Sequence, residues 1–404
     1  EEKAKATFNY NFMGQTIKTS TVFNYTDDTL KSSVTYRGDL SVKTAGVITD
    51  IRAIDEFQSG DLDANGQLVS GRSYDARRSV TIYTGNESEE KAKATFNYNF
   101  MGQTIKTSTV FNYTDDTLKS SVTYRGDLSR KDNTGKIIGI RNIREYSASE
   151  ENAVKLQNAQ REKEEEDKSP LVYTYDARRS VTIYTGNESE EKAKATFNYN
   201  FMGQTIKTST VFNYTDDTLK SSVTYRGDLS VKTADGVITG NRAVVELTAA
   251  MVNTDGSIKT GSVYDARRSV TIYTGNEGEE KAKATFNYNF MGQTIKTSTV
   301  FNYTDDTLKS SVTYRGDLSV KTAGVITDIR AIDEFQSGDL DANGQLVSGR
   351  SYDARRSVTI YTGNESEEKA KATFNYNFMG QTIKTSTVFN YTDDTLKSSV
   401  TYRG

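Results

Sequence analysis

Side chains of opposite character alternate along three consecutive stretches near the start of the chain. Over residues 4–12, Ala, Phe and Tyr occupy every second position, and Lys, Thr and Asn lie between them. A similar alternation runs over residues 17–25 and 30–37. This period of two predicts β-strands with one buried and one wet face. The joints are short and contain Gly or Asp, so the pattern predicts an antiparallel meander.

The string over residues 1–38 recurs and starts again at Glu89, Glu190, Glu279 and Glu367. The copies predict modules 1–88, 89–189, 190–278 and 279–366, and a partial module 367–404. Residues 1–126 return as residues 279–404, so three modules form a super-repeat of 278 residues. Inside a module, units of about 13 residues repeat. We expect the array to continue on both sides of this chain.

Variable segments separate the shared strings. Segment 42–73, its copy 320–351 and the diverged segment 231–263 still alternate and contain Gly turns, so we expect the sheet to continue through them. Segment 130–174 differs, because a helix is predicted near 149–167. Ser147 or Ser149 caps this helix, and two glutamates follow in its first turn. Apart from a narrow apolar stripe, the surface of the helix is charged.

These patterns predict an all-β fold, a continuous antiparallel meander that forms a spiral tube or a β-solenoid-like array. The alternative is a row of tandem β-sandwich domains of about 90 residues, one for each module. The chain holds one Pro and no Trp, and the rhythm of about 13 residues runs past the module joints. These observations favour the continuous meander, since separate domains are usually joined by marked linkers.

Three short segments resemble the YD repeats of RHS and teneurin proteins, whose pattern is Tyr-Asp-x-x-Gly-Arg-Leu. They are residues 173–179, 74–78 and 63–68, and residues 8–16 resemble a degenerate copy. The resemblance implies a long antiparallel β-ribbon that spirals into a hollow shell, on bacterial toxins or extracellular proteins. Arg replaces the family's glycine in residues 74–78, and the C-terminal self-cleavage signature has no counterpart. The extracellular β-array role is the part of the family's function that carries over.

Composition excludes several kinds of chemistry. The 51 basic and 54 acidic residues give a net charge of −3 without a basic stripe, so we predict no nucleic-acid partner. The chain has no Cys and no His, which excludes thiol nucleophiles and Ser-His-Asp triads. No run of 18 apolar residues occurs, so we predict no transmembrane segment in this stretch. We therefore expect no catalytic residues, no cofactor and no enzymatic activity.

Two sets of residues could bind or carry other groups. The first set resembles the start of a calcium loop, with oxygen ligands at alternate positions: Asp61, Asp63 and Asn65, repeated as Asp339, Asp341 and Asn343. Arg72 stands where an EF-hand has its bidentate Glu, so an Asn-Gly hairpin turn is the alternative. The second set has N-glycosylation sequons: Asn24, Asn112, Asn213, Asn302 and Asn390.

Identical modules make sense where every segment performs the same mechanical task. The sequence therefore predicts a structural segment of a very long extracellular or cell-surface filament, tube or sheath protein. Its expected partners are neighbouring repeats of the same chain, or other copies through self-association. The alternatives are an adhesin stalk and a shell segment of an RHS-type toxin cage.

Overall fold

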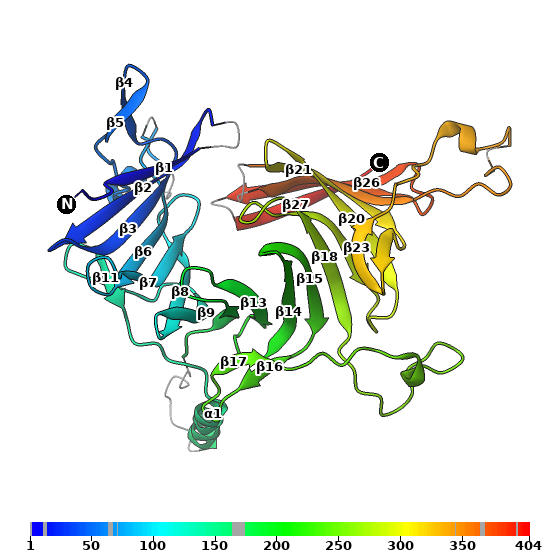
Figure 1. The fold of residues 1–404 in the computed structure, drawn as a ribbon, viewed down its shortest axis with the longest axis horizontal. Coiled ribbons are helices and arrows are strands. Elements are labelled where there is room, and N and C mark those ends of the chain that lie inside the picture. Colours follow the sequence, from blue (N-terminus) through cyan, green and yellow to red (C-terminus); the bar gives the residue numbers. More distant parts are fainter. Residues whose placement is uncertain are drawn as a thin grey trace. The chain divides into compact units, whose positions relative to one another are not determined.

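The computed structural model describes residues 2–10, 14–63, 68–70, 72–163, 174–343, 345–363, 368–392 and 395–404. Within this part, nineteen strands belong to one sheet, four further strand pairs form small hairpins, and the chain has one α-helix (Figure 1). The fold is therefore all-β, as the alternation predicts. The chain divides into two compact units, one built mainly from residues 17–192 and the other mainly from residues 208–404.

In the first unit, each strand of the main sheet pairs antiparallel with the next along the chain. These strands are β1 (Ala6–Tyr10), β2 (Ile17–Thr26), β3 (Thr29–Arg37), β6 (Arg77–Thr84), β7 (Lys91–Tyr98), β8 (Ile105–Thr114), β9 (Thr117–Arg125) and β12 (Arg178–Thr185). Strand β13 (Lys192–Tyr199) belongs to the same sheet. The continuous meander is thus confirmed.

The second unit has the same order of antiparallel pairs. Its strands are β14 (Ile206–Thr215), β15 (Thr218–Arg226), β18 (Arg267–Thr274), β19 (Lys281–Tyr288), β20 (Ile295–Thr304), β21 (Thr307–Arg315), β24 (Arg355–Thr362), β25 (Lys369–Tyr376), β26 (Ile383–Thr392) and β27 (Thr395–Arg403). Each full module therefore supplies four strands to the main sheet.

The variable segments leave the main sheet, so the expectation that the sheet continues through them is wrong. Each contains a separate two-stranded hairpin. The hairpins are β4 (Ser41–Thr44) with β5 (Val47–Ile51), β10 (Ser129–Lys131) with β11 (Ile137–Ile140), β16 (Ser230–Lys232) with β17 (Ile238–Asn241), and β22 (Ser319–Thr322) with β23 (Val325–Ile329). We call each departure of the chain from the main sheet an excursion. The main sheet continues directly across the first excursion, because the Arg37 amide donates to the Ala76 carbonyl at 2.9 Å.

The hydrophobic core lies between one face of the sheet and the hairpins, and it crosses the module boundaries. Val270 and Ile272 on β18 end the third module, whereas Ala284 and Phe286 on β19 begin the fourth. All four side chains are buried in one cluster, together with Ile326 of the hairpin β22–β23. An equivalent cluster joins the first and second modules. Neighbouring modules therefore share a core, which separate sandwiches would not do.

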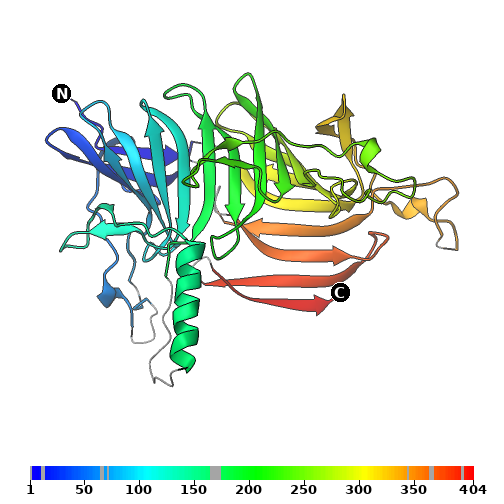
Figure 2. The same ribbon diagram turned by 90° about the horizontal axis from the view of Figure 1, so that it is seen from below.

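The predicted helix is present as α1 (Ala148–Lys163); the expected residues 164–167 lie outside the described residues. The Ser147 hydroxyl accepts a hydrogen bond from the Glu150 amide at 3.4 Å, in the capping position. Leu156 is 67% exposed, and Figure 2 shows the helix extending away from the strands of its unit. No helix in the described part of the chain has the length and apolarity needed to cross a membrane.

Candidate functional site

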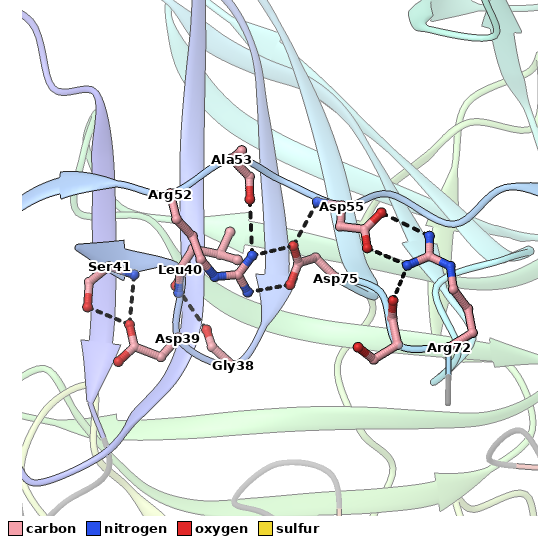
Figure 3. A network of polar contacts seen from close by, with 11 residues as sticks. Gly38, Asp39, Leu40, Ser41, Arg52, Ala53, Asp55, Arg72 and Asp75 are labelled. Carbon is pink, nitrogen blue, oxygen red and sulfur yellow. Dashed lines mark hydrogen bonds and ion pairs between the residues drawn. The ribbon is translucent and has the colours of Figure 1, made fainter. Parts of the chain in front are cut away.

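Each variable segment begins and ends in a fixed set of polar contacts, seen for the first module in Figure 3. The Asp39 carboxylate accepts hydrogen bonds from the Ser41 amide at 2.8 Å and the Ser41 hydroxyl at 2.6 Å. Leu40 follows β3 and is fully buried, and its amide donates to the Ser20 hydroxyl at 3.0 Å. The chain is therefore anchored to the sheet immediately before it leaves for the hairpin.

An arginine–aspartate pair joins the segment that follows β5 to the segment that precedes β6. Arg52 donates to both carboxylate oxygens of Asp75, with its Nη1 2.8 Å from Oδ2 and its Nη2 2.6 Å from Oδ1. The Asp55 amide donates to the same carboxylate at 2.9 Å, and the Asp75 amide returns a bond to the Asp55 carbonyl at 2.7 Å. A bidentate pair of this kind fixes both the distance and the orientation of the two segments.

The electrostatics of this pair favour the ionised carboxylate. Burial of Asp75 works against ionisation, but the hydrogen bonds from Arg52 and from the Asp55 amide outweigh it, so the pKa of Asp75 lies below its usual value. The Asp75 side chain is only 10% exposed, whereas Arg52 is 45% exposed. The excursion is thus held by an ion pair in which the carboxylate is shielded from solvent and the guanidinium is partly exposed.

A second contact ties the excursion to the strand that follows it. The Tyr36 hydroxyl on β3 donates to the Glu56 carboxylate at 2.6 Å. Arg77, the first residue of β6, forms an ion pair with the same carboxylate. Burial, together with the neighbouring Glu56, raises the pKa of Tyr36 well above its usual value, so the phenol stays protonated and donates. Two adjacent main-sheet strands therefore converge on one carboxylate.

The same residue types recur at the base of every excursion. We call the set Leu40, Arg52, Glu56 and Asp75, with its counterparts, the root. The counterparts are Leu128, Arg141, Glu145 and Asp176; Leu229, Arg242, Glu246 and Asp265; and Leu318, Arg330, Glu334 and Asp353. Each counterpart Arg–Asp pair has an Nη2–Oδ1 distance of 2.6 Å. The root is constant although the segments that contain it differ in sequence and length.

Beyond the root, each excursion carries a segment that we call the crown. The crowns are residues 57–73, 146–174, 247–263 and 335–351. The described part of the second crown forms α1, whereas the third contains the 3-10 helix η2 (Ala249–Met251) and the fourth the 3-10 helix η3 (Ser337–Asp339). One root therefore supports both an α-helical crown and crowns that begin with a 3-10 helix, which is the geometry of a scaffold that presents interchangeable loops.

The calcium candidates of the fourth module engage other partners. Asp339 accepts from the Arg350 Nε at 2.5 Å and from the Gln336 amide at 2.7 Å. Asp341 accepts from the amides of Asn343 and Gln345, both at 2.9 Å, as in an Asx turn. A calcium ion at Asp339 would have to displace the Arg350 guanidinium.

The first module repeats this arrangement. The Asp61 carboxylate faces Arg72, with Oδ1 2.5 Å from Nε, and hydrogen bonding from Arg72 holds the pKa of Asp61 below its usual value. Asp63 follows the 3-10 helix η1 (Ser59–Asp61) in the chain, whereas Asn65 lies outside the described residues. Among the described residues, no three acidic side chains are grouped so that they could hold a metal ion.

The five sequon asparagines lie in the second strand of each module, within the sheet. Their side-chain amides donate to serine hydroxyls on the neighbouring strand, at 3.2 Å for Asn24 and at 3.1 Å for the other four. The other four are Asn112, Asn213, Asn302 and Asn390. Glycosylation at these positions would replace a cross-strand hydrogen bond.

Sequence reasoning missed the root. Its signal is the recurrence of Arg, Glu and Asp at fixed places in segments that otherwise vary: Arg52 and Asp75 lie 23 residues apart, as do Arg242 and Asp265. Charged residues at this separation carry no periodic pattern, so only a comparison among the modules can find them. The arrangement is structural, because each root carboxylate is engaged by an arginine and by backbone or tyrosine donors.

The comparisons with known proteins find similarity at the level of structure only. No known family matches the sequence, and no curated protein matches it. The crystal structure of TcdB2-TccC3-Cdc42 is similar over 95% of this chain and 15% of that chain, with 9% identity and a TM-score of 0.19. The Photorhabdus luminescens Tc holotoxin pore is similar over 99% and 16%, with 10% identity and a TM-score of 0.20. The chain thus spans less than a fifth of either, and similarity at these TM-scores carries no functional argument.

Proposed function

We propose that this chain is a structural stretch of an extracellular or cell-surface filament, tube or sheath, in which the sheet lengthens with every module. The crowns are the positions at which the array presents segments that differ from module to module. An adhesin stalk and the shell of an RHS-type cage are the other roles that such an array could serve.

The observation that carries the proposal is the constant register across the excursions. Val34 faces Val80 where β3 meets β6, and the same valine pair recurs at β9–β12, β15–β18 and β21–β24. An excursion of any length therefore leaves the ladder unchanged. Four strands spaced at about 4.8 Å add about 19 Å of sheet for each module, whatever the crown contains.

Shared cores support the same role. Because the hydrophobic cluster around Phe286 contains residues of two modules, adding a module extends an existing core. An array of this type gains length without forming a separate hydrophobic core for each added module. That property suits a long mechanical element better than a catalytic one.

Immunogold electron microscopy of the source cells would test the proposal. Residues 247–263 occur once in the 278-residue block, so an antibody against them should mark the fibres or sheaths of the proposed array at a regular spacing along their length. Label along a short stem below an unlabelled tip would indicate a stalk. Label confined to closed particles that enclose another domain would indicate a shell. Either pattern would contradict the filament proposal.

A further inference from the structure

A basic groove lies in the first unit, between the hairpin β10–β11 and the sheet strands β3, β6 and β7. Its volume is about 520 Å³, within the usual range for binding sites of small ligands. The groove is lined by Thr26, Lys31, Ser32, Ile82, Tyr83, Thr84, Lys93, Arg130 and residues 136–140. It therefore combines an aliphatic floor with hydroxyl groups and cationic side chains.

Four cations line this groove: Lys31, Lys93, Arg130 and Lys136. All four are exposed, and within the described part of the chain none forms an ion pair with a carboxylate. Two acids lie beside the groove: Glu90 accepts a hydrogen bond from the Leu30 amide at 2.9 Å, and Asp132 accepts one from the Lys136 amide at 3.1 Å. Four like charges held close together by a folded scaffold attract an anion more strongly than single surface lysines do.

The fourth module provides an internal comparison. There Lys283, the counterpart of Lys93, forms an ion pair of 2.8 Å with Asp328 on the hairpin. Gly139 replaces this aspartate in the second module, and the guanidinium of Arg130 lies 3.2 Å from the position that a Cβ on Gly139 would occupy. In the second module, the guanidinium of Arg130 therefore lies where the fourth module has the carboxylate of Asp328, which neutralises Lys283.

The hairpin also differs at two further positions. Val320 and Val325 stand in the fourth module where Arg130 and Lys136 stand in the second. The groove of the second module therefore carries four positive charges. The corresponding positions in the fourth module carry Lys220, Lys283 and Asp328, two positive charges and one negative. The site is specific to the second module although the surrounding sheet sequence is the same.

We propose that this groove binds an anionic oligosaccharide that carries sulfate or phosphate groups. The cations pair with the charged groups, while Ile138 offers apolar surface to the face of a sugar ring. Ile138 is 49% exposed, so this surface is open to a ligand. Single-stranded nucleic acid fits less well, because base recognition uses open aromatic faces, and among the described residues the only ring that lines the groove is the half-buried Tyr83.

Calorimetric titration of the whole chain at low salt would test the proposal. The probes are a sulfated octasaccharide, a phosphorylated mannose oligomer, the unsulfated octasaccharide and a single-stranded oligonucleotide. We expect one site for at least one of the two charged sugars, no binding of the unsulfated sugar, and weakening as salt rises. Failure of both charged sugars to bind, or equal affinity for the oligonucleotide, would overturn the proposal.

Two variants connect the binding to the groove. R130V/K136V, which introduces the residues of the fourth module, should weaken binding about tenfold. V320R/V325K/D328G, the reverse exchange in the fourth module, should raise the stoichiometry from one site to two. Unchanged binding in the first variant would place the site elsewhere. If the second variant does not fold, as judged by circular dichroism, the first still decides the outcome.

Discussion

At the scale of single residues, the carboxylate of Asp265 holds a whole excursion in place. It accepts two bonds from Arg242, at 2.6 and 2.8 Å, and one from the Val245 amide at 2.8 Å. The side chain is 9% exposed, so water does not readily replace these donors. Losing the charge leaves Arg242 without its partner and the amide without a strong acceptor.

Replacing this carboxylate should therefore destabilise the chain. We expect Asp265→Asn to lower the free energy of unfolding by about 1–3 kcal/mol, measured by urea denaturation at neutral pH. Asp255→Asn is the matched control, since Asp255 lies in the crown of the same excursion and its carboxylate bonds only the neighbouring Ser257. An equal loss in both variants would contradict a special role for the root.

The same pair predicts a direction for the pH dependence. The pKa of Asp265 is lowered in the folded chain, because hydrogen bonds from Arg242 and Val245 outweigh the cost of burial. The unfolded chain therefore takes up this proton first as the pH falls, and the stability contributed by the pair is lost below about pH 4. In Asp265→Asn, this part of the acid sensitivity should be absent.

At the scale of secondary-structure elements, alternation predicted the three strands that each shared string contributes. It did not identify the fourth, the strand that begins at Arg77 and its counterparts. The hairpins also alternate, because they bury one face against the same core from the other side. Alternation shows that a strand has one buried face, but not which sheet the strand joins. Alternation therefore does not distinguish the hairpins of the excursions from strands of the main sheet.

The candidate site shows a similar limit. The spacing of Asp61, Asp63 and Asn65 resembles a calcium loop, yet the sequence alone does not show that Arg72 folds back onto Asp61. The helix, in contrast, was predicted closely, because capping and charge in its first turn are local signals. Local signals can be read from the sequence, whereas pairs that meet across an excursion leave no local pattern.

The independence of root and crown gives a prediction at this scale. Replacing residues 146–174, the crown that contains α1, by residues 247–263 should leave the free energy of unfolding, measured by urea denaturation, unchanged within about 0.5 kcal/mol. The root residues Glu145 and Asp176 stay in place, and most side chains over residues 148–157 of α1 are exposed. Loss of the β-sheet signal in circular dichroism would show that the crown supports the sheet.

At the scale of the whole chain, the modules visible in the sequence are units of repetition but not of packing. The core cluster around Phe286 contains Val270 and Ile272 from one module and Ile326 from the next. Stability in such an array depends on the contact between neighbours. The central claim is therefore that damage at a module boundary spreads to both sides of it.

Hydrogen exchange in Phe286→Ala tests this claim most directly. The fully buried ring begins the fourth module, and its removal should cost about 3–5 kcal/mol. The continuous sheet predicts that amide protection falls in β18 of the third module as well as in β19 and β20 of the fourth. Protection lost only from residue 279 onward, with β18 unchanged, would show that the modules fold as separate domains and would contradict the account.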